Sequence, residues 1–231
     1  IVTVYTGEMV NSEQLKEQII KTRSLTDRPF GVNLITMHPA LGELIQVCIS
    51  SNITHVALAG GLPPSDSIKR LKDSKIKVLA FAPTLAVGKR LVRAGVDALI
   101  IEGLEAGGHV GPVSTSVLAQ EILPAIRKVP VYVAGGIGRG AAMAMYLNMG
   151  ASGVQMGTRF VCAKESIAHP KFKEAFIRAN ARDAVLTVQI DKRFPVIPVR
   201  ALSNKGTELF YKRQQEVISE CEAGKMTVDE A

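Results

Sequence analysis

A regular alternation of short apolar runs and helical patterns is the feature of this sequence that most restricts its fold. The apolar runs are continuous rather than alternating in polarity, as expected for strands that are buried on both faces of a parallel sheet. They occupy residues 1–5, 30–35, 55–59, 78–81, 98–101, 131–134 and 153–156. Helical patterns separate them at residues 11–21, 40–49, 65–72, 86–94, 116–127 and 140–149. This β/α succession predicts a parallel sheet with helices outside it.

The number of runs indicates which parallel fold to expect. Seven strands are counted up to residue 156, whereas eight strands close a TIM (β/α)8 barrel. We therefore expect an α/β fold of the TIM-barrel type. Residues 1–163 would form strands 2 to 8, and the first strand and the C-terminal end of the barrel would be missing from this chain. An open, doubly wound sheet is the alternative. No Gly-x-Gly-x-x-Gly motif follows the first run, which disfavours a dinucleotide-binding sheet.

Residues 164–231 depart from the alternation. Helical patterns at residues 171–181 and 207–223 flank a segment in which Pro195 and Pro198 lie close together, and this spacing excludes a central strand. We expect these residues to form a helical and irregular excursion that packs at the barrel mouth. The 231 residues, 47% of them hydrophobic, suffice for one large core, so the excursion is not expected to be an independent domain.

Composition excludes several classes of protein. The net charge of +7 is spread along helical segments without interleaved aromatic residues, which argues against nucleic-acid binding and leaves an acidic substrate or carrier open. No apolar run approaches the roughly 20 residues that span a bilayer, and no leader pattern opens the sequence, so we expect a cytoplasmic protein without a membrane partner. Cys48, Cys162 and Cys221 are widely spaced, which indicates neither disulfides nor a metal site. Cys48 and Cys162 are interpreted as core thiols.

A glycine-rich loop with a histidine follows the fifth apolar run. Residues 102–111 hold four glycines around His109, so the backbone can take positive φ and approach a planar ligand, while the imidazole titrates near neutral pH. Such a loop at the end of a barrel strand is typical of a catalytic site. The alternative is a surface loop whose histidine hydrogen-bonds to its own turn.

Two further glycine loops follow the last two runs. Residues 135–140 lead into a helical pattern, and Gly157 and Thr158 follow the final run. In α/β barrels a phosphate commonly binds between the loops after strands 7 and 8, because backbone N–H groups and a helix N-terminus form an anion site there. Together the two loops predict a site for a phosphate monoester, whereas each alone is also compatible with ordinary turn chemistry.

Other polar residues at strand ends would face the same mouth, including Asn33, Glu102 and Gln155. An isoalloxazine ring needs hydrogen bonds at its pyrimidine edge and close backbone approach at one face, which makes a flavin the simplest ligand for this set. Buried amides satisfied by the backbone are the alternative for Asn33 and Gln155. His38 and His55 are interpreted as structural, and His169 is placed either near the mouth or as a helix cap.

Four segments can be read together: residues 30–34 (FGVNL), 105–109 (EAGGH), 131–137 (VYVAGGI) and 153–160 (GVQMGTRF), followed by Glu165, Ser166 and His169. They resemble the nitronate monooxygenase family, formerly called 2-nitropropane dioxygenase. The resemblance covers nearly the whole chain in the right order, and FMN-dependent enoyl-acyl-carrier-protein reductase II is a close relative of the family. A Gln-Gly-Gly-Met-like segment that ends the family's first strand has no match in this sequence.

The resemblance implies a TIM barrel that holds non-covalent FMN. Gly135, Gly136, Gly157 and Thr158 would then hold the phosphate. The ring and ribityl chain would be lined by Asn33, Gly107, Gly108 and Gln155, with Glu102 also at the cofactor site. His109 would be the catalytic residue.

Three functional hypotheses follow. The first is oxidation of alkyl nitronates by O2 to carbonyl compounds and nitrite, with His109 as the base toward a neutral nitroalkane or as the group that positions the nitronate. The alternative is reduction of an enoyl thioester, or of a quinone, by the same FMN with NAD(P)H, and His109 would then stabilise or protonate the enolate. A non-catalytic remnant is the third. The expected partners are thus small molecules, and a homodimer is left open.

Overall fold

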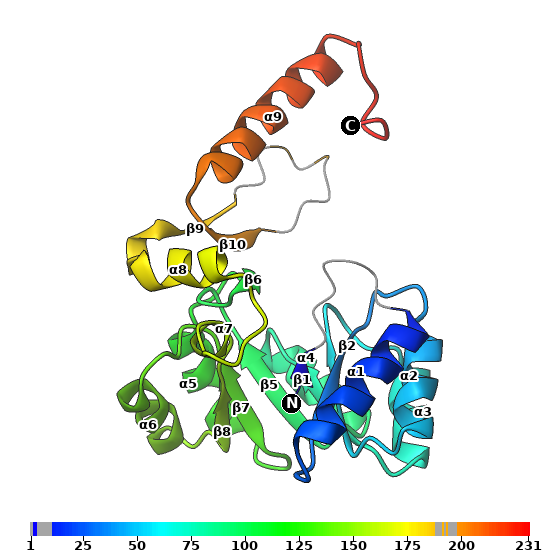
Figure 1. The fold of residues 1–231 in the computed structure, drawn as a ribbon. Coiled ribbons are helices and arrows are strands. Elements are labelled where there is room, and N and C mark those ends of the chain that lie inside the picture. The colour runs from blue at the N-terminus through cyan, green and yellow to red at the C-terminus, as the bar shows by residue number, and fades with distance from the viewer. Residues whose placement is uncertain (1, 4–10, 188–190, 192, 194–197) are drawn as a thin grey trace.

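The computed structural model describes residues 2–3, 11–187, 191, 193 and 198–231. Its main feature is a parallel sheet with the strand order β1-β2-β3-β4-β5-β7-β8 (Figure 1). The strands are β1 (Val2–Thr3), β2 (Gly31–Ile35), β3 (His55–Ala59), β4 (Lys77–Phe81), β5 (Ala98–Glu102), β7 (Val131–Ala134) and β8 (Gly153–Gln155). The seven expected strands are confirmed, although Ile1, Val4 and Tyr5 of the first run and residues 194–197 lie outside the described residues.

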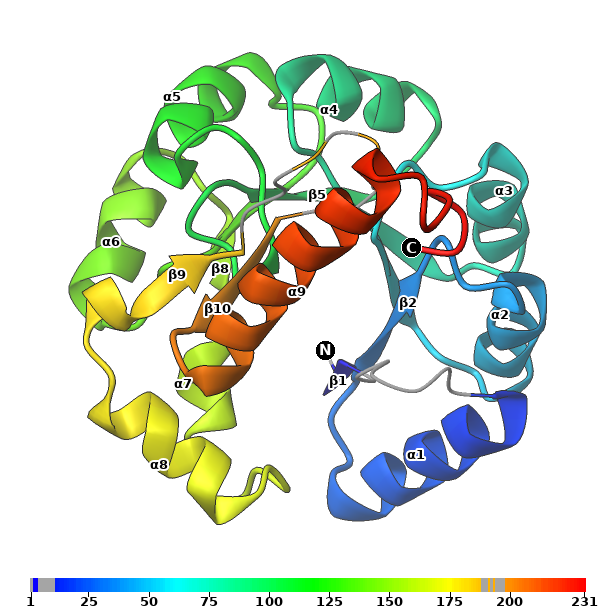
Figure 2. The same ribbon diagram turned by 90° about the horizontal axis from the view of Figure 1, so that it is seen from above.

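Six helices connect these strands and lie outside the curled sheet (Figure 2). They are α1 (Ser12–Leu25), α2 (Leu41–Ser50), α3 (Ser65–Asp73), α4 (Leu85–Arg93), α5 (Thr115–Ala125) and α6 (Gly140–Asn148). The Asn11 side chain caps α1 by accepting from the Gln14 amide at 2.9 Å, and the Gln14 side chain accepts from the Asn11 amide at 3.0 Å. Alternating strands and helices with short connections therefore produce the TIM-barrel type of fold that the sequence predicts.

The two faces of the sheet carry different side chains. Outward residues such as Val32, Val56 and Leu99 belong to the large core formed with the helices. Inward residues form a smaller cluster of Ala57, Leu79, Ala98, Ile100 and Ala134, against which Phe81 and Tyr132 pack. Since three of these five inward residues are alanine, the interior of the curled sheet is less filled than its outer face.

The part of the chain after β8 contains helices and two strands of a second, smaller sheet above the barrel. The elements of this part are α7 (Thr158–Val161), α8 (Pro170–Arg178), β9 (Ala184–Leu186), β10 (Val199–Leu202) and α9 (Lys205–Glu222). Strand β10 pairs antiparallel with β9 and also with β6 (Gly108–His109), which belongs to the glycine-rich loop after β5. Figure 1 shows this sheet between the barrel and α9. The histidine loop is therefore joined to the C-terminal part of the chain.

The cysteines only partly match the sequence analysis. Burial of Cys48 in the core raises the pKa of its thiol to about 12, so this residue is an inert core thiol as predicted. Cys162 is half-buried, and the prediction of a core position was wrong, because it follows the exposed short helix α7 rather than a buried strand. In the described part of the chain, no helix combines the length and the apolarity needed to cross a bilayer.

Candidate active site

Several of the predicted polar residues lie at the carboxyl ends of the strands. Glu102 of β5 is in register with Ala134 of β7, which is in register with Gln155 of β8. Glu102 and Gln155 are thus at the same level of the sheet, two strands apart, and both are half-buried. Asn33 is also half-buried, but it lies on β2, three strands from β5, beside Ala57 of the inner cluster.

Glu102 is the titratable group whose environment is most unusual at this end of the barrel. Burial raises the pKa of its carboxyl group from an ordinary value of 4.5 to about 7. Within the described residues, no hydrogen bond to the carboxylate compensates for the lost hydration. A carboxyl group in this state is largely protonated below neutral pH, so it can donate a hydrogen bond to a ligand at the mouth.

The stability of the protein is predicted to depend on pH through Glu102. Its folded pKa of about 7 exceeds 4.5, so between these values the folded state binds more protons than the unfolded state, and the free energy of unfolding falls as the pH rises. The full loss is roughly 3 kcal/mol and is complete above pH ~7. Glu102→Gln removes this penalty.

Denaturant unfolding of both proteins at pH ~5 and pH ~8 measures the effect. The variant should gain stability relative to the unsubstituted protein by roughly 2 to 3 kcal/mol more at the higher pH. If the variant and the unsubstituted protein differed in stability by the same amount at both pH values, the raised pKa of Glu102 would be contradicted.

The loop after β5 is folded back on itself and fixed to the start of α5. The Leu104 amide donates to the Val113 carbonyl at 2.7 Å, and the Ala106 amide donates to the Gly103 carbonyl at 3.2 Å. The Glu105 carboxylate accepts from the Thr115 amide at 2.7 Å, at the first turn of α5. Burial acts to raise the Glu105 pKa, but the hydrogen bonding to Thr115 and the positive charge of Arg200 outweigh it and lower the pKa. Glu105 therefore stays ionised and holds this end of the loop.

The glycines after β7 pack against that same loop. Gly135 and Gly136 have φ values of +94° and +69°. A Cβ atom on Gly135 would lie 3.0 Å from the Ala106 nitrogen, and one on Gly136 would lie 3.0 Å from the Glu105 Cβ. Both residues thus allow close contact between the loops after β5 and β7. Their assignment to a phosphate stays a prediction.

His109 is the exposed residue of β6, and it pairs with Val199 of β10. Gly108 has a φ of +90°, and neither Gly107 nor Gly108 would bring a Cβ within 4 Å of a neighbour. The imidazole is therefore carried by an open stretch of backbone whose order comes from pairing with β10. The side chain of Arg200, the next residue of β10, donates to the carbonyl oxygens of Leu104 and Ala106.

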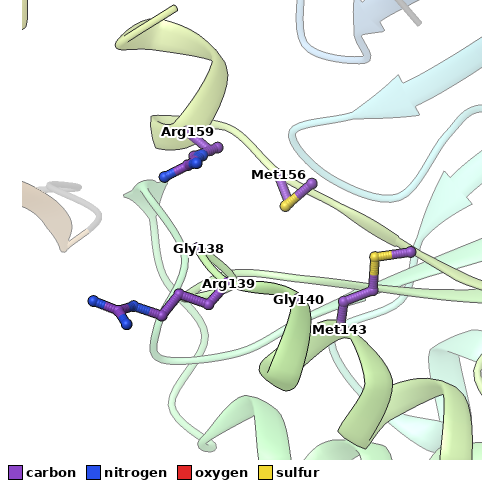
Figure 3. Close-up of a pocket in the computed structure, with 6 residues that line it drawn as sticks. All are labelled: Gly138, Arg139, Gly140, Met143, Met156 and Arg159. Atoms are coloured by element: carbon purple, nitrogen blue, oxygen red, sulfur yellow. The ribbon is translucent and has the colours of Figure 1, made fainter.

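A cavity of about 470 Å³ lies where the loops after β7 and β8 meet (Figure 3). It is lined by Gly138, Arg139, Gly140, Met143, Met156 and Arg159. Arg139 is the N-cap of α6, and none of the side chains that the structure describes caps this helix, so its first N–H groups are available to an anion. Arg139 and Arg159 are the charged residues among those that line the cavity, and positive charge beside a helix N-terminus suits a phosphate.

The position of the cavity agrees with the two loops that the sequence singles out, but the lining residues differ in part. The glycines that line the cavity are Gly138 and Gly140, which follow the predicted Gly135 and Gly136 in the same loop. Gly157 and Thr158, the other two predicted phosphate ligands, are exposed between the lining residues Met156 and Arg159. Sequence reasoning missed Arg139 and Arg159, although arginine within a glycine loop that opens a helix was a usable signal.

Each of the remaining histidines has a hydrogen-bond partner close to it in the sequence. The His38 ring accepts from the Ala40 amide through Nδ1 at 3.1 Å, and the His169 ring caps α8 by accepting from the Lys171 amide at 3.2 Å. His55 is exposed at the first residue of β3, at the opposite end of the strand from the mouth. The structure therefore places His109, and not these three, in a glycine-rich loop at the strand ends.

A curled parallel β/α sheet with a cavity between the loops after its last two strands defines a protein of the α/β-barrel class. The sequence model of the family described as nitronate monooxygenase matches residues 43–229. The chain belongs to this family, which consists of flavin-dependent oxidoreductases.

Curated relatives with different names are similar to the chain. A (3aS,4S,5R,7aS)-5-hydroxy-7a-methyl-1-oxo-octahydro-1H-indene-4-carboxyl-CoA dehydrogenase of Rhodococcus jostii is 34% identical over 77% of this chain and 50% of its own length. A nitronate monooxygenase of Paraburkholderia phytofirmans is 28% identical over 87% of this chain and 66% of its own length. The chain thus spans about half the length of the Rhodococcus protein.

Among solved structures, FabK from Thermotoga maritima superposes with a TM-score of 0.86 and 35% identity, covering 96% of this chain and 69% of FabK. Nitroalkane oxidase from Streptomyces ansochromogenes has a TM-score of 0.71 and 27% identity, covering 84% of this chain and 67% of the oxidase. These two similarities confirm the barrel-type fold.

Proposed function

We propose that the chain is the FMN-binding and catalytic part of a nitronate monooxygenase, which converts alkyl nitronates and O2 to carbonyl compounds and nitrite. The observation that carries this proposal is the cavity formed by Gly138–Gly140, Met143, Met156 and Arg159, next to a mouth with Glu102, Gln155 and the loop of His109. Membership of the nitronate monooxygenase family over residues 43–229 supports the reaction.

The residues of the cavity fit the phosphate end of FMN. A Cβ atom at Gly138, Gly140 or Gly157 would have no neighbour within 4 Å, so open space lies beside these backbones. Arg139 and Arg159 supply positive charge at the cavity, and the uncapped N-terminus of α6 supplies N–H donors. Gly157 and Thr158, together with Gly135 and Gly136, complete the proposed phosphate-binding loops.

The strand ends would hold the rest of the cofactor. Gln155 and Asn33 would bind the polar edge of the ring, and the open backbone of Gly107 and Gly108 would lie against a face. Glu102, whose raised pKa of about 7 keeps it largely protonated below neutral pH, would then donate a hydrogen bond rather than repel an electron-rich ring. When bound, FMN supplies the two-electron redox chemistry.

His109 would handle the proton of the substrate. Its imidazole is exposed at the mouth, and its glycine neighbours leave room for a small molecule. As a general base it would take the proton from the carbon that bears the nitro group of a neutral nitroalkane. With a substrate that is already a nitronate, the same ring would donate a hydrogen bond to the nitro oxygens and orient the carbon.

The two arginines of the cavity lead to a prediction on cofactor affinity. Arg159→Met is expected to raise the Kd for FMN roughly tenfold or more, because it removes a charge-assisted contact to the phosphate. Arg139→Met should act in the same direction. Fluorescence titration of the apoprotein with FMN and with riboflavin, which lacks the phosphate, gives the measurement.

The expected loss of affinity is confined to FMN, and riboflavin should bind to all the variants with the same Kd. Arg127→Met is the matched control, since Arg127 donates to the carbonyl of Pro124 at the end of α5, away from the cavity. Equal loss of FMN and riboflavin affinity in Arg159→Met would refute the phosphate assignment.

Stopped-flow absorbance of the holoprotein tests the reaction itself. The protein is mixed anaerobically and in air with propyl nitronate, and in parallel with NADH or NADPH. Flavin reduction by the nitronate, with nitrite appearing in air, is the expected result. Reduction by the nicotinamide alone would reject nitronate oxidation.

The similarity to FabK over 96% of the chain favours a second candidate, reduction of an enoyl thioester with NAD(P)H. The same site would serve this reaction, with His109 protonating the enolate carbon or stabilising the enolate oxygen. Reoxidation of the NAD(P)H-reduced flavin by an enoyl thioester, and not by a quinone, would distinguish it from quinone reduction. A purified full-length protein without a flavin spectrum would instead favour the non-catalytic remnant. The homodimer and the cytoplasmic location stay predictions.

A further inference from the structure

Arg200 connects three segments that are distant in sequence. Its Nη2 donates to the Leu104 carbonyl at 2.6 Å, and its Nε donates to the Ala106 carbonyl at 3.2 Å. Its Nη1 donates to the Ala184 carbonyl at 2.9 Å, on the neighbouring strand β9. Each nitrogen of the half-buried guanidinium group thus contacts the backbone, and two of the three contacts reach the loop that carries His109.

The same loop is held by strand pairing on either side of this contact. Arg200 is opposite Gly108 in the β6-β10 ladder, and the Val110 amide donates to the Pro198 carbonyl at 3.3 Å. Gly107 lies between Ala106 and Gly108, and a Cβ atom at Gly107 would have no neighbour within 4 Å. Because glycine confers little stiffness, the carbonyl contacts of Arg200 add to the backbone hydrogen bonds of Leu104 and Ala106 in fixing where this part of the loop lies.

A lysine in this position could not make the same contacts. The guanidinium group is planar and presents its donors in a fixed fork, whereas a lysine has one nitrogen on a flexible stem. Charge-assisted hydrogen bonds are also about twice as strong as neutral ones. Arginine therefore suits a role in which two loop carbonyls and one strand carbonyl are held at once.

We propose that Arg200 is a positioning residue for His109, through which the small sheet β6-β10-β9 holds the loop after β5 in its reactive arrangement. The role of His109 in this statement rests on the proposed function. Arg200 acts on the loop backbone, so its loss disturbs the placement of the imidazole, whereas the residues that line the phosphate cavity belong to other loops and make none of these contacts with Arg200. An error of about 1 Å in such a placement can cost roughly 10² in rate.

Hydrogen exchange followed by mass spectrometry on the full-length chain tests the loop directly. Arg200→Met keeps an unbranched chain but removes the donors, and it is expected to speed exchange in residues 103–111 roughly 10- to 100-fold. Arg200→Lys should give an intermediate rate. Arg182→Met is the control, because Arg182 lies in the same part of the chain with a side chain that is 89% exposed. Unchanged exchange in residues 103–111 of both Arg200 variants would overturn the proposal.

Steady-state kinetics of the same variants separate positioning from general damage. Arg200→Met should lower kcat roughly 10- to 100-fold with KM changed by less than about threefold, and Arg200→Lys should restore part of the rate. Equally faster exchange throughout the barrel, or a rise in KM alone, would refute positioning. If the unsubstituted holoprotein turns over none of the substrates, the proposed function fails, while the exchange data still decide whether Arg200 holds the loop.

Discussion

His109→Ala is expected to lower kcat by roughly 10² to 10⁴ while leaving the FMN content of the purified protein unchanged. The histidine lies in an exposed two-residue strand at the mouth, so its removal creates no cavity in the core. The cavity with Arg139 and Arg159 is built from other loops and would still bind the phosphate. This variant is therefore predicted to lose turnover while it keeps its FMN.

The rate of flavin reduction by substrate and the flavin-to-protein ratio are the two quantities to measure. His55→Ala is the matched control, since His55 is also exposed but lies at the opposite end of its strand from the mouth. Turnover of His109→Ala at the level of the control would remove His109 from the mechanism. Loss of flavin in His109→Ala would assign the residue to cofactor binding.

Gly103→Ala is expected to have the largest effect on stability. A Cβ atom at this position would lie 2.4 Å from the Val113 carbonyl oxygen, 2.6 Å from the Thr115 nitrogen and 2.8 Å from the Thr115 Cα. All three atoms belong to the backbone at the start of α5, so no side chain can turn aside to relieve the clash. We expect a loss of about 3 kcal/mol or more and a Tm lower by roughly 6 to 12 °C.

Calorimetry of the Gly103→Ala and Gly107→Ala variants compares their Tm values. A Cβ atom on Gly107 would meet nothing within 4 Å, so that variant should keep the Tm of the unsubstituted protein within about 2 °C. Similar Tm values for the two variants would show that the loop moves to accommodate a methyl group. The distances at Gly103 would then not describe a rigid contact.

The barrel could be predicted from the sequence because its strands are buried on both faces. A continuous apolar run such as residues 98–101 has few alternatives to a strand of a parallel sheet, and it was found as β5. The small sheet could not be predicted in this way. Strand β6 consists of Gly108 and His109 alone, and it is a strand only because Val199 and Arg200 lie beside it. Such an element is defined by pairing, because Gly108 and His109 have no apolar pattern and the short apolar run of β10 is interrupted by Arg200.

The sequence indicates which loops surround the candidate site better than it indicates which of their residues face the cavity. The loops after β7 and β8 do meet at a cavity, as the barrel rule requires. Within them, sequence alone cannot tell a glycine that faces a ligand from one that faces another loop. Gly135 contacts the backbone of Ala106, whereas Gly138 lines the cavity. Arg200 gave no signal, because its three partners are carbonyl groups, which every residue has.

The pairing of β6 with β10 also sets a time order for the folding chain. Arg200 follows Ala106 by 94 residues, so at roughly 5 to 20 residues per second the ribosome supplies it on the order of 5 to 20 s later. All seven strands of the barrel have been synthesised before that moment. The nascent chain can thus form the barrel and its cavity while the histidine loop still lacks the strand that orders it. The order of the histidine loop therefore follows the synthesis of the seven described strands of the sheet.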